Sequence, residues 1–203
     1  MINICQIQDE KVTFEEALNK EINNRIKNFA DQLKTNKQSI AYYTQKRNVK
    51  SEKAYEDICL GKKAEFILAI HLGIKYNFPI ISPDLEIRKG NKKGWGIDLP
   101  YAQINSQYPN IHVKACSNST LKFCQDYSWT FQYNNRNDKF GQDDLFKYNN
   151  NDLIAMMFLE NYESRYGVIK AILPWEKIKL YLKDPLKPTL QGLKLCVYYK
   201  DLK

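Results

Sequence analysis

The chain has 203 residues, of which 43% are hydrophobic and 27% are charged, and 31 Lys and Arg outnumber 23 Asp and Glu to give a formal net charge of +8. A chain of this length and composition can bury one hydrophobic core, which excludes an intrinsically disordered chain and a small disulfide-stapled scaffold. The positive charge is compatible with a polyanionic partner such as nucleic acid, and by itself it indicates no chemistry.

The sequence predicts neither a membrane span nor a disulfide framework. No stretch approaches the roughly 20 apolar residues that cross a bilayer, and the N-terminus, MINICQIQDE, lacks the basic and apolar regions of a secretory signal. The five cysteines are an odd number without a CxxC pair, so a reducing compartment fits. We therefore expect an intracellular, cytoplasmic protein with no membrane partner. It should form a single domain over 1–203, in which a mainly helical, basic region at about 1–53 packs on, or extends from, a core at about 54–203.

The N-terminal third begins with a predicted amphipathic helix. Residues 13–33 carry apolar side chains at three- and four-residue spacing, and Thr13 has the side chain of an N-cap. The polar, basic segment 35–53 follows, with Lys46 and Arg47 after a pair of tyrosines. This segment is either a solvated linker or an arm that faces nucleic acid.

A second helix is predicted over residues 52–76, where apolar positions recur despite Gly61. Glu65 lies inside this helix in the run KKAEFILAIHL. A carboxylate on the sheet-facing side of so apolar a helix needs a cation or hydrogen-bond donors to offset its desolvation. Glu65 is therefore either a candidate ligand or a surface glutamate whose side chain reaches solvent.

A β region follows the second helix. A hairpin is predicted from strands at 85–88 and 95–99, and the next strand, at 111–116, places His112 and Lys114 on one face. The tip of the hairpin holds four basic side chains: Arg88, Lys89, Lys92 and Lys93. Further strands are predicted at 121–133, 153–160, 167–173 and 193–199, with a short helix at 175–182. This order of elements predicts an α/β or α+β fold.

The chemistry-bearing residues lie around the second hairpin strand. Asp98 ends that strand in the run GWGIDLP, and 13 residues separate it from His112. If neighbouring strands pair, Asp98, His112 and Lys114 converge. A carboxylate can hold a divalent cation, and a lysine can orient an attacking water or stabilise charge that develops on phosphorus. These are the parts of metal-assisted phosphodiester hydrolysis.

At these residues the sequence resembles the PD-(D/E)XK nuclease superfamily, over about residues 54–133. The resemblance depends on the order of a helix with Glu65, a hairpin that ends at Asp98 and a strand with Val113 and Lys114. It implies a mixed central β-sheet flanked by helices, the restriction-endonuclease-like core. It also implies that Glu65, Asp98 and the backbone carbonyl of Val113 bind Mg²⁺ or Mn²⁺, and that Lys114 is catalytic.

The activity that the resemblance implies is a metal-dependent endonuclease that hydrolyses DNA, of the type II restriction type or a related site-specific kind, encoded by a prokaryote or a phage. Cutting two antiparallel strands of duplex DNA with copies of one site favours a homodimer. The alternatives are a catalytically inactive nucleic-acid-binding protein, and a resolvase or RNA-processing nuclease on the same fold.

His112 departs from the family pattern, because an acidic residue is usual two positions before the lysine. Either His112 binds the metal, which favours Mn²⁺ over Mg²⁺, or it contacts the scissile phosphate or a water while Asp98 and Glu65 hold the ion. Loss of activity is a third reading. The literal PD pair that ends at Asp84 is set aside, because the acidic-x-basic unit at 86–88 follows too closely for a turn. We interpret Asp84 as the cap of a strand.

Several polar residues beyond the hairpin tip suit contacts with nucleic acid. Short hydrogen-bonding side chains follow the strand at 111–116, and a glutamine ends the next predicted strand. Such groups bind phosphates or read base edges. The residues concerned are Ser117, Asn118, Ser119 and Gln132. For the hairpin tip a solvated loop is the alternative. Trp129, near Gln132, is predicted to belong to the core.

Overall fold

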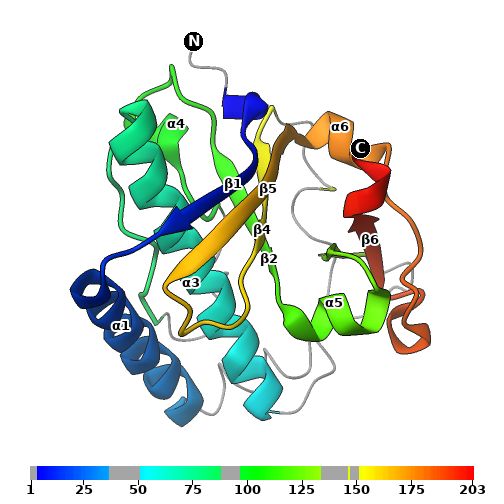
Figure 1. Cartoon of the computed structure of the whole chain (residues 1–203), viewed down its shortest axis with the longest axis horizontal. Helices are drawn as coiled ribbons and strands as arrows, with labels where there is room; N and C mark the ends of the chain where they lie inside the picture. Colours follow the sequence, from blue (N-terminus) through cyan, green and yellow to red (C-terminus); the bar gives the residue numbers. More distant parts are fainter. Residues whose placement is uncertain (1–3, 37–50, 88–96, 134–145, 147–150) are drawn as a thin grey trace.

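The computed structural model describes residues 4–36, 51–87, 97–133, 146 and 151–203, and they fold around a four-stranded mixed sheet (Figure 1). Its order is β1-β5-β4-β2, with β2 parallel to β4 and the other pairs antiparallel. The strands are β1 (Gln8–Thr13), β2 (Ile111–Cys116), β4 (Leu153–Phe158) and β5 (Tyr166–Pro174). The predicted α+β class and mixed sheet are confirmed.

The two central strands, β4 and β5, match their predictions because their sequences consist mainly of apolar residues that become buried. All six residues of β4 are buried, since side chains pack on both faces of this strand. The antiparallel register with β5 pairs Ile154 with Leu173 and Phe158 with Val168, with an irregularity between Met156 and Met157. A fully buried strand reads as a continuous apolar run, so β4 is visible in the sequence.

The edge strand β1 was not predicted, because its sequence QDEKVT is polar and mostly exposed. It pairs with β5 from Gln8 opposite Ala171 to Thr13 opposite Tyr166. A charged edge strand discourages pairing with other chains. The assignment of Thr13 as the N-cap of a helix is therefore wrong: Thr13 ends β1, and the helix begins at Glu16 after Glu15, without a side-chain cap bond.

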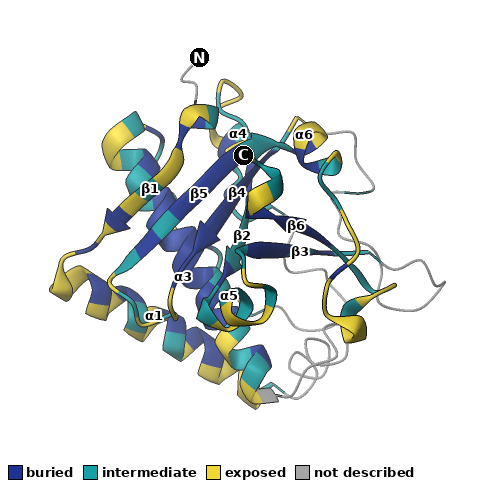
Figure 2. Cartoon of the chain, turned by 45° about the vertical axis from the view of Figure 1, so that its right-hand side comes forward, coloured by how far each residue is buried: buried dark blue, intermediate teal, exposed yellow. Residues whose placement is uncertain are grey.

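Two long helices, α1 (Glu16–Thr35) and α3 (Ser51–Tyr76), cover one face of the sheet (Figures 1 and 2). Helix α1 buries a single stripe that includes Ile22, Ile26 and Phe29. Helix α3 is buried over most of its circumference between residues 58 and 69, because it packs against α1, the sheet and the segment 78–87. Among the helices that the structure describes, none combines the length and apolarity that a bilayer-spanning helix requires.

A second, two-stranded sheet lies on the other face of β2 and β4. It consists of β3 (Ser128–Gln132) and β6 (Lys194–Tyr198), which are antiparallel. Trp129 is only 1% exposed, and its indole N–H donates to the carbonyl of Met157 at 2.9 Å, which joins the two sheets. Trp129 is therefore a core residue, as predicted.

Helix α5 (Asn118–Cys124) corrects the strand predicted over 121–133. The carbonyl of Ser117 accepts bonds from the N–H groups of Thr120 and Leu121, which begins the helix. Gln125 then takes the left-handed conformation at φ 52, and the strand begins three residues later. The range 121–133, predicted as one strand, is thus divided between the end of helix α5 and the short strand β3, and the left-handed Gln125 ends the helix.

The predicted hairpin has no strand in the described part. Residues 85–87 are irregular, and near Asp98 there is one isolated antiparallel bridge, between Leu99 and Ile111. Residues 88–96, which include the tip, lie outside the described residues, as do Lys46 and Arg47. Two short helices, α4 (Tyr101–Ile104) and α6 (Trp175–Lys179), lie before β2 and after β5. The described N-terminal residues belong to the same sheet and core as the rest, through β1 and α1.

Candidate active site

Asp98 lies at the edge of β2 that β4 does not occupy. Leu99 and Ile111 exchange two backbone hydrogen bonds of 3.0 Å, which fixes the segment before α4 against this edge. One step further along β2, the N–H of Val113 donates to Oδ2 of Asp98 at 2.8 Å. The N–H and C=O of one residue in an extended strand point to the same side, so the Val113 carbonyl lies at the same edge as the Asp98 carboxylate.

Glu65 lies on α3, buried at 5% exposure, and its carboxylate accepts a hydrogen bond from the Lys62 ammonium at 2.8 Å. Burial raises the pKa of Glu65 to about 8; the positive charge of Lys62 opposes this rise, and the negative charges of Asp98 and Asp84 add to it. Glu65 is therefore buried, and the alternative of a surface glutamate whose side chain reaches solvent is wrong.

The structure thus brings two of the predicted ligands, Glu65 and Asp98, within electrostatic range of each other, with the carbonyl of Val113 beside Asp98. These are oxygen donors, and Mg²⁺ is usually bound through one or two carboxylates while it keeps several waters. The donor set therefore fits a hard divalent cation. Within the described ranges, no group of three or more His, Cys, Asp or Glu side chains is arranged to hold a metal ion.

The structure places His112 against a different carboxylate. Its Nε2 lies 3.0 Å from Oδ2 of Asp152, and the side-chain amide of Asn110 donates to the other oxygen of Asp152 at 3.3 Å. Val113 packs in the core against α3, so its neighbour His112 points to the opposite face of the sheet. The described contacts therefore do not bring His112 to Glu65.

Lys114 shares the face of His112, as predicted. Its ammonium lies 5.2 Å from the ring centre of Phe131, a residue of the core between the two sheets. Glu65 lies on the α3 side of β2. Asp98 stands at the strand edge between these two faces, so the four predicted catalytic residues surround β2 without sharing one face.

Two charged residues of this region, Lys62 and Asp152, were not predicted to belong to it, and a third, Asp84, was set aside. Lys62 precedes Glu65 by three positions, a spacing that places both on one side of a helix and could have revealed the pair. The interpretation of Asp84 as the cap of a strand is wrong, because residues 85–87 form no strand. Asp84 instead caps a turn, since its Oδ1 accepts from the N–H of Glu86 at 2.8 Å, and its charge also reaches Glu65. Asp152 follows an Asn-rich run, and no signal in the sequence linked it to His112.

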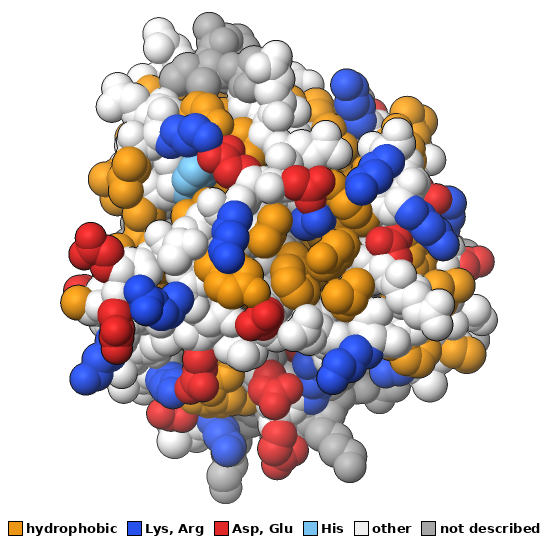
Figure 3. Space-filling model, viewed as in Figure 1, with side chains coloured by type: hydrophobic (Ala, Val, Ile, Leu, Met, Phe, Trp, Pro, Cys, Tyr) orange, Lys and Arg blue, Asp and Glu red, His pale blue; other side chains and the backbone are white. Residues whose placement is uncertain are grey.

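The predicted nucleic-acid contacts fall partly within the described residues. Ser117 precedes α5 and its hydroxyl lies 3.0 Å from that of Ser119, while Asn118 begins the helix and Gln132 ends β3. The six basic residues at 46–47 and 88–93 lie outside the described part. On the face shown in Figure 3, basic and acidic side chains are interspersed around a central group of hydrophobic side chains. The net positive charge is not gathered on that face.

No family model, curated protein or solved structure matches this chain. The function must therefore be inferred from the geometry at the edge of β2.

Proposed function

We propose that the protein is a metal-dependent endonuclease with a restriction-endonuclease-like core, whose site is formed by Glu65, Asp98 and the carbonyl of Val113. One observation carries the proposal. The carboxylate of Glu65, buried in α3 with its pKa raised to about 8, lies within electrostatic range of the carboxylate of Asp98 at the edge of β2. A buried carboxylate such as Glu65, with a second carboxylate nearby, costs stability unless a cation or hydrogen-bond donors compensate it. Carboxyl groups whose pKa is raised by burial and by nearby negative charge, as that of Glu65 is, are common at functional sites.

Each residue of the proposed site would have its own role in hydrolysis. Glu65, Asp98 and the Val113 carbonyl would hold a divalent cation, which when bound supplies a Lewis acid for a phosphate oxygen and lowers the pKa of a water. In the hydrolysis, the water oxygen bonds to phosphorus and the P–O bond to one sugar breaks. One proton of the water is released to solvent, and the leaving oxygen takes up a proton. The amide of Val113 holds Asp98 in place at 2.8 Å.

The substrate class follows from the same proposal. Duplex DNA, cut by a homodimer of the type II restriction type or a related site-specific kind, needs two copies of the site related by a twofold axis. Mg²⁺ is the proposed cofactor, because every proposed ligand is an oxygen; His112 would be the ligand that favours Mn²⁺. A panel of duplex DNA, branched DNA and RNA substrates distinguishes the restriction type from a resolvase or an RNA-processing nuclease.

The test is plasmid cleavage with Mg²⁺ or Mn²⁺ against an EDTA control. We expect Asp98→Ala and Glu65→Gln to abolish cleavage while DNA binding survives. Asp57→Ala is the matched control, since Asp57 lies on the same helix in a partly exposed ion pair with Lys53. Full cleavage by both site variants would refute the assignment.

A second candidate, a nucleic-acid-binding protein without catalysis, is favoured by one observation. His112, at the usual position of an acidic ligand, is turned to Asp152 on the other face of the sheet. This candidate predicts retarded mobility of DNA on a gel with no cleavage in either metal, and no effect of Asp98→Ala on binding.

A further inference from the structure

Among the described residues, Lys62 is a cation that the structure places beside Glu65 at the proposed site. Its ammonium lies 2.8 Å from Oε2 of Glu65, and both side chains are largely buried, at 10% and 7% exposure. The i,i+3 spacing on the well-packed helix α3 fixes the two groups relative to each other. Lys62 therefore reaches the α3 side of β2, where the proposed metal ligands lie.

Lys114 lies elsewhere. Its ammonium is 5.2 Å from the centre of the Phe131 ring, on the face of β2 that packs toward the second sheet. A lysine that acts on a phosphate held at Glu65 and Asp98 must reach those carboxylates, and the described contact of Lys114 points away from them. The family resemblance implies Lys114 as the catalytic lysine, whereas the fold places Lys62 beside Glu65.

An ammonium carries three N–H donors. Among the described residues, the hydrogen bond of Lys62 goes to Glu65 and uses one donor. A nearly buried cation with further donors beside a buried carboxylate is suited to a phosphate oxygen, because removal from water strengthens the attraction between opposite charges. The negative charge of a phosphate near Lys62 would offset the positive charges of the ammonium and of a divalent ion.

We propose that Lys62, rather than Lys114, provides the ammonium that contacts the phosphate undergoing hydrolysis. This inference depends on the proposed nuclease function. In the absence of substrate Lys62 pairs with Glu65, and with metal and phosphate present it shifts its donors to a phosphate oxygen that carries increasing negative charge in the transition state. The residue would stabilise charge without taking part in proton transfer.

The same geometry predicts an effect on metal binding that is independent of cleavage. A positive charge 2.8 Å from the Glu65 carboxylate opposes a second cation at that carboxylate. Removing the charge should therefore tighten Mg²⁺ binding, whereas removing a charge at Lys114 should not.

The experiment compares Lys62→Met, Lys62→Arg and Lys114→Met in the full chain, with Lys53→Met as the control. Lys53 lies on the same helix in an ion pair with Asp57 at 2.9 Å, and its side chain is 43% exposed. Single-turnover plasmid cleavage at saturating protein measures the chemical step, and the thermal shift on titration with Mg²⁺ measures metal affinity. Circular dichroism confirms folding, and Lys62→Arg keeps the charge if Lys62→Met does not fold.

We expect Lys62→Met to slow single-turnover cleavage by about 100-fold or more, as loss of a charge-stabilising donor typically does. It should also respond to lower Mg²⁺ concentrations than wild type. Lys62→Arg should restore part of the rate, and Lys114→Met and Lys53→Met should stay near wild type.

The inference is overturned if wild type cleaves DNA and Lys62→Met cleaves equally well, or if Lys114→Met alone loses the chemical step. For a Lys62→Met that does not fold, a Lys62→Arg that cleaves no better than an EDTA control overturns the charge-stabilising role. If wild type itself neither cleaves nor responds to Mg²⁺, the nuclease proposal fails first and this inference fails with it.

Discussion

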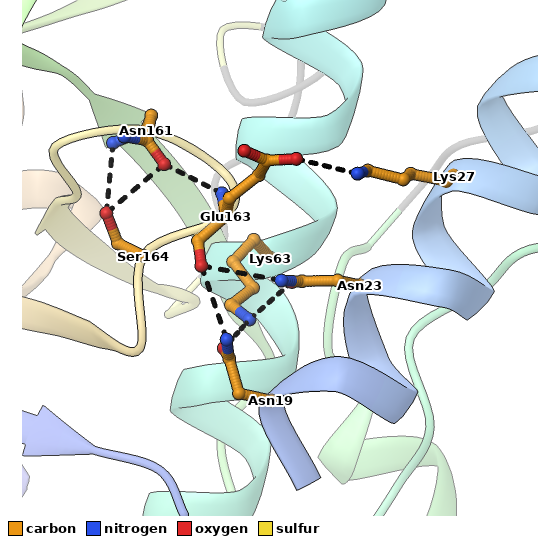
Figure 4. A network of polar contacts seen from close by, with 7 residues as sticks. All are labelled: Asn19, Asn23, Lys27, Lys63, Asn161, Glu163 and Ser164. Atoms are coloured by element: carbon orange, nitrogen blue, oxygen red, sulfur yellow. Dashed lines mark hydrogen bonds and ion pairs between the residues drawn. The ribbon is translucent and has the colours of Figure 1, made fainter. Parts of the chain in front are cut away.

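Lys63 is fully buried in α3, and its ammonium donates to the side-chain oxygens of Asn19 and Asn23 on α1, with no carboxylate among its partners in the described part of the chain (Figure 4). The bond to Asn23 is 2.7 Å. The two amides in turn donate to the backbone carbonyl of Glu163 in the β4–β5 turn, at 3.3 and 3.4 Å. Lys63 therefore links both long helices to the sheet through neutral partners.

Burial lowers the pKa of Lys63 from its ordinary value of 10.5 to about 8. Below pH 8 both the folded and the unfolded chain carry the proton, and the folded state bears the full cost of the buried charge. Between pH 8 and 10.5 the unfolded chain binds more protons, so the free energy of unfolding rises with pH. At 1.36 kcal/mol for each pKa unit, the rise amounts to about 3 kcal/mol.

The perturbation is Lys63→Met, which keeps an unbranched chain of similar length and removes the charge. Near pH 7 we expect a small net change in stability. The gain from removing a buried charge is about 3 kcal/mol, and it is offset by the two amide oxygens left without a donor, at roughly 1–3 kcal/mol each. The diagnostic quantity is therefore the pH dependence of the difference between wild type and variant.

Urea unfolding at a series of pH values from 7 to 10.5 measures this difference. We expect the stability of wild type relative to Lys63→Met to rise by about 3 kcal/mol across the window. Lys27→Met is the control, since the exposed ion pair of Lys27 with Glu163 at 2.6 Å should contribute at most about 1 kcal/mol. A relative stability that is flat with pH, or that falls, would refute the reasoning.

Three further predictions concern α3, the proposed site and the joint between the sheets. Gly61→Ala should stabilise the protein by up to about 1 kcal/mol in urea unfolding, because Gly61 is inside a helix and an added Cβ would meet nothing within 4 Å; a loss of stability would contradict this. Asp98→Asn should lower the pKa of Glu65 from about 8, because it removes a negative charge that adds to the effect of burial; the carboxyl ¹³C shift of Glu65 measures it, and an unchanged midpoint would show that the two groups do not interact. Trp129→Phe should cost roughly 1–3 kcal/mol in thermal unfolding, because it leaves the buried carbonyl of Met157 without its 2.9 Å bond; a neutral result would mean that water replaces the indole.

The elements that could be predicted from the sequence are those in which one local signal dominates. Helix α3 and strand β2 were predicted within one residue of their observed bounds, and β4, β5 and β6 within two. Each of these elements has a strong pattern of apolar residues, and these residues are buried in the folded chain. Strand β1 and helix α5 were missed, because β1 is a polar edge that pairs only with distant β5, and α5 buries none of its residues.

The candidate site shows the same division between local pattern and tertiary arrangement. From the sequence it followed that a carboxylate at Glu65 would need compensation if it were buried, and that His112 and Lys114 share a face of β2. The burial of Glu65 and the partners of these side chains depend on the folded chain: Lys62 for Glu65, the Val113 amide for Asp98 and Asp152 for His112. Alternation along a strand fixes which residues share a face, whereas the side of β2 that α3 covers depends on packing between segments far apart in the chain.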